Sequence, residues 1–232
     1  MKRSDESPAP TPDIQSLYPF LYSDSSDIDA VFEQVRKSTR DKAREIVELR
    51  KSVFDRDGGR LLECTAAMAR RFADGGRLLA FGNGGSSTDA QDLASLFLSP
   101  APGPGGAFPP LPAFALTNDV AVITALSNDV GFDVVFARQI AAFARPRDVV
   151  VGLSTSGNSP NLLRAFDEAK KQDLLTIGIA GYDGGKMAEL DSVDHLFVVP
   201  SPSVHRVQEA QTTLYHALWE LTVTYLRERT KP

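Results

Sequence analysis

The sequence predicts an α/β fold of three layers, with a mostly parallel central sheet between two layers of helices. Short apolar runs typical of buried strands alternate with helical patterns along most of the chain. Alternation at this spacing requires right-handed crossovers between parallel strands and places helices on both faces of the sheet. Two of the apolar runs also end in loops rich in Gly, Ser and Thr, each of which opens into a helical pattern. The carboxyl ends of parallel strands meet at one edge of a sheet, so the loops predict a binding crevice there.

The N-terminal part of the chain is expected to lie outside the sheet. Residues 1–14 are charged and rich in Pro and Ser, which predicts a disordered tail. Apolar residues then recur at helical spacing over 27–53 and 60–73, within an N-terminal helical region assigned to 15–76. The glycines at 75 and 76 end the second helix just before the first strand.

Residues 77–232 form the α/β domain in this interpretation, and the whole chain is one structural unit. Strands are expected at 78–81, 112–116, 149–153, 175–180 and 196–199. Helices are expected at 89–98, at 160–170 and, as a long amphipathic helix, at 207–227. The Pro- and Gly-rich segment 100–106 indicates a flexible loop, either a lid or an inert insertion. The N- and C-terminal helices carry more apolar surface than one sheet face needs, which predicts that they pack between subunits.

The two loops have the chemistry of an anion-binding site. The first loop runs from Gly82 to Thr88 and the second loop from Ser154 to Ser159. The first N–H groups of a helix are unpaired and carry the positive end of the helix dipole, which favours phosphate. Turn and N-cap chemistry explains one such loop, but the second loop contains more hydroxyls than one cap requires. The residues expected to hold the anion are Asn83, Gly84, Gly85, Ser86, Ser154, Thr155, Ser156 and Ser159.

Neither loop has a nucleotide-binding pattern. No Lys follows the glycines of the first loop, as a Walker motif requires, and their spacing is not that of the dinucleotide fingerprint. The ligand is therefore expected to be a small phosphorylated molecule.

Composition excludes several other classes of protein. The formal net charge of -5 offers no basic surface to nucleic acid. The single cysteine, Cys64, excludes an internal disulfide framework and lies in a helical pattern, which predicts a core residue rather than a nucleophile. No apolar run reaches the roughly 18 residues of a membrane span, and the polar N-terminus is no signal peptide. We therefore expect a cytoplasmic protein with no membrane contact.

Together these motifs resemble the sugar isomerase (SIS) domain, and more narrowly the phosphoheptose isomerases, over about residues 27–228. Besides the two loops, the resemblance rests on stretches at 118–119, 128–129, 181–187 and 206–209. It implies a flavodoxin-like fold and a homotetramer whose active sites take helices from neighbouring subunits. It also implies that Ser86 and the serines of the second loop hold the phosphate of a sugar. The implied reaction is an aldose–ketose isomerisation of sedoheptulose 7-phosphate or a related sugar phosphate through a cis-enediol.

The resemblance also implies which side chains move the protons. In the family, the base is a Glu one turn after a His, on the helix that follows the first loop. Its partner is a His on the last helix, eight residues after a Gln, and some members bind zinc through all four side chains. Gln208 and His216 match the second pair, and Asp119 matches a family position near the crevice where it is expected to bind substrate, although an Asp there also serves as a cap. Asp92 and Leu96 stand where the family has the His and the Glu, and leucine neither accepts a proton nor binds a metal.

Three interpretations of this departure stay open. In the first, Asp92 and His216 are the catalytic pair and Gln208 binds substrate. Zinc is then not required, and any zinc on Asp92, Gln208 and His216 would be weakly held. In the second, the protein binds a phosphorylated sugar without isomerising it, as a regulator or scaffold, like catalytically degenerate members of the family. In the third, His205 and Glu209 have moved the chemistry by one turn.

Overall fold

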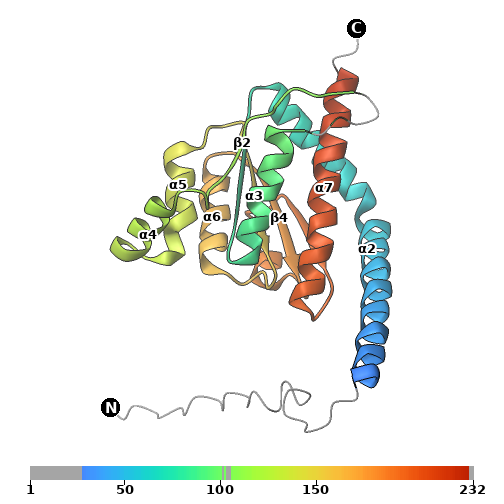
Figure 1. The fold of residues 1–232 in the computed structure, drawn as a ribbon. Helices are drawn as coiled ribbons and strands as arrows, with labels where there is room; N and C mark the ends of the chain where they lie inside the picture. Colours follow the sequence, from blue (N-terminus) through green and yellow to red (C-terminus); the bar gives the residue numbers. More distant parts are fainter. Residues whose placement is uncertain (1–27, 101, 103–105, 230–232) are drawn as a thin grey trace, which may run out of the picture. The chain divides into compact units, whose positions relative to one another are not determined.

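The computed structural model of the protein describes residues 28–100, 102 and 106–229 (Figure 1). The helices are α2 (Ile28–Ala73), α3 (Gly85–Leu98), α4 (Val120–Asp129), α5 (Val135–Phe143), α6 (Pro160–Lys171) and α7 (Val204–Arg229), with short 3-10 helices η2 (Phe132–Val134) and η3 (Gly185–Glu189). The strands are β1 (Leu78–Gly82), β2 (Ala113–Ala115), β3 (Val149–Ser154), β4 (Leu175–Gly181) and β5 (His195–Val199). Of the described residues, 28–45 belong to one structural unit and those from 46 onward belong to a second, which contains the sheet. The expected tail at 1–14 and most of the 100–106 segment lie outside the described residues.

The sheet confirms the α/β prediction, with five parallel strands in the order β2-β1-β3-β4-β5. From β1 the chain moves outward to β2 on one side, whereas β3 pairs with β1 on its other side and leads toward β5. This reversal is the switch point of a flavodoxin-like sheet, where the loops after two neighbouring strands turn to opposite faces and leave a crevice. The first loop follows β1 and the second follows β3, so both lie at the switch point.

A separate apolar core covers each face of the sheet. Leu78 and Ala80 of β1 face the core built with α3, α7 and residues 46–73 of α2, and Leu79 and Phe81 face the core built with α4, α5 and α6. Every residue of β1, β3 and β4 is buried, as a parallel sheet covered on both faces requires.

Cys64 lies in the first of these cores, as predicted. It is fully buried, and burial raises the pKa of its thiol far above the usual range. A thiol that stays protonated is a poor nucleophile, so this cysteine is inert.

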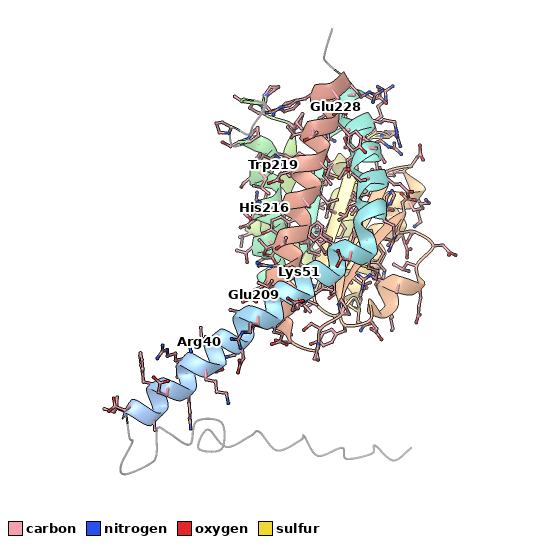
Figure 2. The ribbon with its side chains drawn as sticks, turned by 90° about the vertical axis from the view of Figure 1, so that its right-hand side faces the viewer. Arg40, Lys51, Glu209, His216, Trp219 and Glu228 are labelled. Carbon is pink, nitrogen blue, oxygen red and sulfur yellow. The ribbon has the colours of Figure 1, made fainter. Side chains whose placement is uncertain are left out.

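Helix α7 packs beside residues 46–73 of α2 (Figure 2). Nη2 of Arg50 donates to the carbonyl oxygen of Glu209 at 2.9 Å, and the hydroxyl of Thr222 contacts the sulfur of Met68 at 3.7 Å. These contacts hold α7 against the body of the domain.

The break predicted between two N-terminal helices is wrong, because α2 is continuous from Ile28 to Ala73. The gap between the two predicted helices, residues 54–59, contains Gly58 and Gly59. Glycine in a helix interior costs only about 1 kcal/mol relative to alanine, which tertiary contacts readily offset. A larger residue would also fit at both positions, since no atom lies within 4 Å of a Cβ built at either one.

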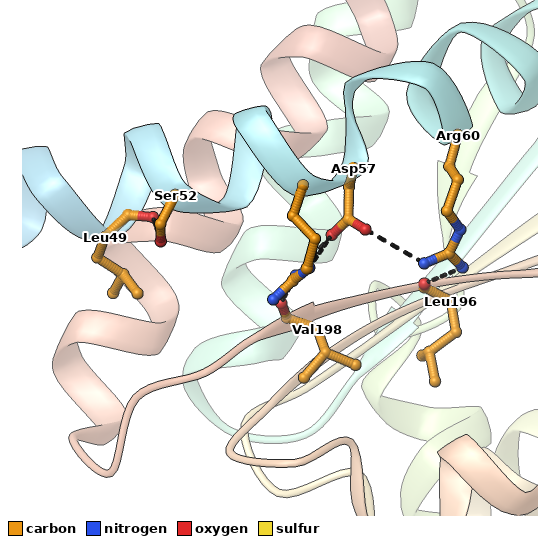
Figure 3. Close-up of polar contacts among 7 residues, drawn as sticks. Leu49, Ser52, Asp57, Arg60, Leu196 and Val198 are labelled. Carbon is orange, nitrogen blue, oxygen red and sulfur yellow. Dashed lines mark hydrogen bonds and ion pairs between the residues drawn. The ribbon is translucent and has the colours of Figure 1, made fainter.

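The contacts that stabilise this part of α2 centre on Asp57, which is 2% exposed (Figure 3). Its carboxylate accepts from Arg56 at 2.6 Å and from Arg60 at 3.2 Å. The same two guanidinium groups donate to the carbonyl oxygens of Val198, at 2.5 Å, and Leu196, at 2.6 Å, in the edge strand β5. The polar segment read as a helix break therefore anchors α2 to the sheet and occupies carbonyls that an edge strand otherwise exposes.

Three smaller differences concern the ends of two helices and one connection between strands. Helix α3 begins at Gly85, four residues before its predicted start, so that Ser86 lies in its first turn. The strand–helix alternation has an exception between β4 and β5, where the connection is the 3-10 helix η3. Helix α7 begins at Val204 and ends at Arg229, beyond both predicted ends. Among the described residues, no helix has the length and apolarity that a membrane crossing needs.

Candidate active site

The first and second loops lie next to each other at the ends of β1 and β3. Gly82, the last residue of β1, pairs in register with Leu153 of β3. Beyond the strands, Asn83 and Asn161 exchange two side-chain hydrogen bonds of 2.9 Å, which join the first loop to the start of α6. Sequence reasoning did not single out Asn161, which is 1% exposed and whose only signal is its place just after the second loop. The loops form one composite site rather than two separate anion cradles.

The first loop brings the N-terminus of α3 to this crevice. Gly84 has φ 55°, a left-handed conformation that glycine adopts without strain, and no side chain caps the helix. Hydrogen bonds from the N–H of Ser86 to Asn83 and from the N–H of Ser87 to Gly84 tighten the first turn. Ser86 itself is 3% exposed. The positive end of the α3 dipole is thus available to a bound anion.

The second loop keeps hydroxyl hydrogens free to donate. The Oγ of Ser154 accepts from the N–H of Gly157 at 3.0 Å, and the Oγ of Ser156 accepts from the N–H of Asn158 at 3.3 Å. A hydroxyl that accepts a hydrogen bond still has its own hydrogen to donate. Ser159 is the N-cap residue of α6, yet its side chain makes no capping hydrogen bond. Turn and cap chemistry therefore uses the hydroxyl oxygens of Ser154 and Ser156 as acceptors, and the hydroxyl hydrogens of the loop stay available to a ligand.

Residues 184–187, which follow β4, pack against the second loop and hydrogen-bond to it. Gly157 has φ 66°, and a Cβ there would collide with the carbonyl oxygen of Gly184. The carbonyl of Gly157 accepts from the N–H of Met187 at 2.9 Å, and the Oδ1 of Asn158 accepts from the N–H of Lys186 at 2.9 Å. These contacts with residues 184–187 make the second loop a rigid cradle.

Helix α7 places two glutamines against the loops. A Cβ at Gly85 would collide with Nε2 of Gln208, so this predicted binding residue touches the start of α3. Gln211, which sequence reasoning missed, is fully buried, and its Nε2 donates to the carbonyl oxygens of Ser154 at 3.0 Å and Ile179 at 3.2 Å. Its spacing of three residues from Gln208 was the available signal. Gln211 fixes the end of β3 where the second loop begins.

The structure brings the two predicted catalytic residues together where α3 packs on α7. Oδ2 of Asp92 lies 3.8 Å from Nε2 of His216, and their side chains are 53% and 41% exposed. The same carboxylate oxygen accepts a 2.7 Å hydrogen bond from the hydroxyl of Tyr215, whose ring stacks on that of His216. Burial raises the pKa of Tyr215 well above its usual value, so the phenol stays protonated. In Figure 2, His216 lies on the side of α7 that faces the viewer, near Trp219.

Asp89, a second residue that sequence reasoning missed, lies one turn before Asp92 on α3. One of its carboxylate oxygens is buried and has no hydrogen-bond partner among the described residues. Burial, and secondarily the charge of Asp92, raises the pKa of Asp89 to about 6. The i,i+3 spacing of two acidic residues just after the first loop was the signal that could have found it.

Asp89→Asn should therefore stabilise the protein at neutral pH. Because folding raises the pKa of this carboxyl, the protonated form stabilises the folded state below about pH 4, and that stability is lost as the pH rises through about 6. Asn keeps the shape without the charge, so we expect the variant to gain about 1–2 kcal/mol over the parent at pH 7.5, after allowance for partial exposure, and nothing at pH 4. Urea unfolding of both proteins between pH 4 and 8 measures this. A constant difference across the range would contradict it.

The remaining predicted residues occupy other positions. Thr155 is half-buried within the second loop, and Leu96 packs partly buried against the core beneath α3. Asp119 is exposed and caps α4, since its Oδ1 accepts from the N–H of Val122 at 3.0 Å. Glu209 forms an ion pair with Arg206. The described contacts thus give no support to a catalytic pair of His205 and Glu209.

The donor set at this place does not fit a four-ligand zinc site. Asp92 and His216 are the two strong donors, and Leu96 offers none. An amide such as that of Gln208 is a poor zinc ligand. Within the part of the chain that the structure describes, no three or more His, Cys, Asp or Glu side chains are grouped to hold a metal.

A cavity of about 210 Å³ adjoins the first loop on the α4 side. Its lining combines backbone and hydroxyl groups with apolar side chains. Its lining comprises Gly82, Asn83, Gly84, Ser87, Thr117, Val120, Ile123, Phe132 and Phe136.

Comparison with known proteins gives consistent matches. The family model described as SIS domain matches residues 43–181. A phosphoheptose isomerase of Nitratidesulfovibrio vulgaris is 39% identical, over 84% of this chain and 92% of its own length. One from Solidesulfovibrio magneticus is 45% identical, over 75% of this chain and 83% of its own length.

A solved structure shows the same relationship. The phosphoheptose isomerase of Neisseria gonorrhoeae is 34% identical, with a TM-score of 0.73, over 81% of this chain and 99% of its own.

Proposed function

The chain belongs to the SIS domain family, among the phosphoheptose isomerases, and from this premise we propose that it is an aldose–ketose isomerase of sedoheptulose 7-phosphate or a related sugar phosphate. The named relatives favour an isomerase over a non-catalytic regulator or scaffold. The observation that carries the proposal is the arrangement of the composite loop site beside the pair Asp92 and His216.

The spacing along α3 suits a substrate of this kind. Ser86 and Asp92 are six residues apart, which corresponds to about 9 Å along a helix axis. A phosphate held by Ser86 and the second loop would leave room for the carbon chain of a sugar between it and Asp92. The reacting carbonyl end would then lie near Asp92 and His216.

In this mechanism, Asp92 and His216 divide the proton transfers. Asp92 removes a proton from C1 of the ketose while His216 protonates the oxygen on C2, which gives the cis-enediol. Asp92 then returns its proton to C2, and His216 takes the proton from the oxygen on C1 to form the aldose. No proton is gained or lost overall. Zinc is not required in this mechanism, because both steps use groups of the chain.

We further propose a homotetramer with inter-subunit active sites. The first part of α2 exposes large apolar side chains, with Ile28 at 75%, Phe32 at 65% and Val35 at 58%, which supports packing against another subunit. Light scattering would give the mass of a tetramer, and a monodisperse monomer at micromolar concentration would contradict this proposal.

A turnover assay on sedoheptulose 7-phosphate tests the function directly. Metal-analysed protein should convert the ketose to the aldose at the same rate with and without added zinc. Stabilisation by sugar phosphates without turnover of any of them would instead support the non-catalytic alternative. Dependence of the rate on added zinc would contradict the metal-free mechanism.

Ser156→Ala should weaken the binding of sugar phosphate. The loss of one hydroxyl donor to a charged phosphate costs about 1.5–3 kcal/mol, or roughly 10- to 150-fold in Kd. Thermal shift with sedoheptulose 7-phosphate measures the loss, and the free sugar should give no shift for either protein. Ser95→Ala, which removes an exposed hydroxyl of α3, is the matched control. Equal binding by parent and Ser156→Ala would place the phosphate elsewhere.

A further inference from the structure

We propose that Tyr215 is a positioning residue for proton transfer, which holds the Asp92 carboxylate by a hydrogen bond while its ring supports His216. The inference rests on the proposed function, because it assigns a role within the isomerase site. Neither the loop pattern nor the spacing of Gln208 and His216 predicts such a role.

The contact to Asp92 gives a flexible group a fixed position. The Asp92 side chain is 53% exposed on the surface of α3, where a carboxylate would otherwise occupy several rotamers. Tyr215 is 2% exposed, and its hydroxyl lies 2.7 Å from Oδ2 of Asp92. A buried donor bonded to one carboxylate oxygen leaves the other oxygen, Oδ1, free to take a proton from substrate. Tyr215 thus selects which oxygen acts as the base.

The ring of Tyr215 also supports His216, the second catalytic residue. The two rings are stacked with centroids 5.3 Å apart and planes inclined by 27°. Oδ2 of Asp92 and Nε2 of His216 are 3.8 Å apart, which is too long for a hydrogen bond. The carboxylate is therefore bonded to the phenol and not to the imidazole, so both catalytic groups keep an open site for substrate. One side chain fixes the geometry of the pair.

Tyr215→Phe tests this role, because it removes the hydroxyl and keeps the ring that stacks on His216. We expect kcat for sedoheptulose 7-phosphate to fall about 10- to 100-fold, since a misplaced catalytic group costs about that much, and KM to change less than about twofold. Tyr225→Phe is the matched control, as Tyr225 is partly buried on the same helix, and it should keep the parent kcat and KM.

The double variant separates positioning from general damage. If Tyr215 acts through Asp92, Tyr215→Phe should lower kcat by less than about threefold in an Asp92→Ala background. The inference is overturned if Tyr215→Phe keeps the parent kcat, if it raises KM in proportion, or if it costs the same factor with and without Asp92.

A spectroscopic readout checks the contact without turnover. The tyrosine Raman doublet depends on whether the phenol donates a hydrogen bond, and the signal of Tyr215 is the difference between the parent and Tyr215→Phe. This difference should change in Asp92→Ala, and an unchanged signal would overturn the inference even in an active enzyme. A parent inactive on every sugar phosphate would overturn the proposed function and this inference with it. An active parent with an unaffected Tyr215→Phe variant would overturn the inference alone.

Discussion

His216→Ala should lose turnover of sedoheptulose 7-phosphate almost completely. The imidazole is the group that the mechanism gives to the two substrate oxygens, and its ring lies 3.8 Å from the Asp92 carboxylate. A positioned general acid or base contributes roughly 10²–10⁴-fold, and no other described side chain at this contact is placed to replace it. We expect kcat to fall by about this factor, while binding of the phosphate, which uses the loops, stays near the parent value.

His205→Ala discriminates between the two histidines of α7. His205 is exposed at the start of the helix, and we expect this variant to keep the parent kcat. If His205→Ala loses activity and His216→Ala keeps the parent kcat, a catalytic pair of His205 and Glu209 is favoured instead. Thermal shift with sedoheptulose 7-phosphate on both variants shows whether any loss lies in binding or in chemistry.

The sheet and its two loops could be predicted from the sequence because their signals are local. A buried parallel strand appears as a short apolar run, and the first and second loops end two such runs. The sequence predicts that both loops lie at the same edge of the sheet, and the structure shows that β1 and β3 are neighbours. The continuous α2 was missed for the opposite reason. Asp57 and its two arginines stabilise the helix through β5, a strand more than 130 residues later in the chain.

The side chains that complete the site could not be predicted, because their partners lie far away in the sequence. Tyr215 and Asp92 are 123 residues apart, and Gln211 reaches a carbonyl 57 residues earlier. Asn161 meets Asn83 only because α6 and the first loop share one edge of the sheet. Such contacts depend on the three-dimensional placement of helices, for which no local pattern exists. Gln208 and His216 were found through the resemblance to the family, in which a Gln and a His stand eight residues apart on the last helix.

Leu96→Glu should raise turnover of sedoheptulose 7-phosphate. Leu96 follows Asp92 by one turn of α3, and neighbouring side chains at this spacing lie about 5–6 Å apart. Asp92 takes the proton directly only from a substrate that is shifted by about one turn relative to a base at position 96, so the parent should be slow. Leu96→Gln is the matched control, since it has the shape of Glu without a basic oxygen and should give no gain.

The result of this substitution decides what the loss of the family Glu means. The Leu96 side chain is partly buried, so a carboxylate there should have a raised pKa, and the gain in kcat should grow between pH 6 and 8 as it ionises. We expect a gain of at least tenfold, up to the 10²–10⁴-fold that a general base supplies, and His216→Ala should remove it. A parent that is already fast and becomes slower with Glu at this position would contradict the prediction. Asp92, held by Tyr215, would then be the adapted base, and the leucine would mark a substrate or a geometry different from that of the relatives.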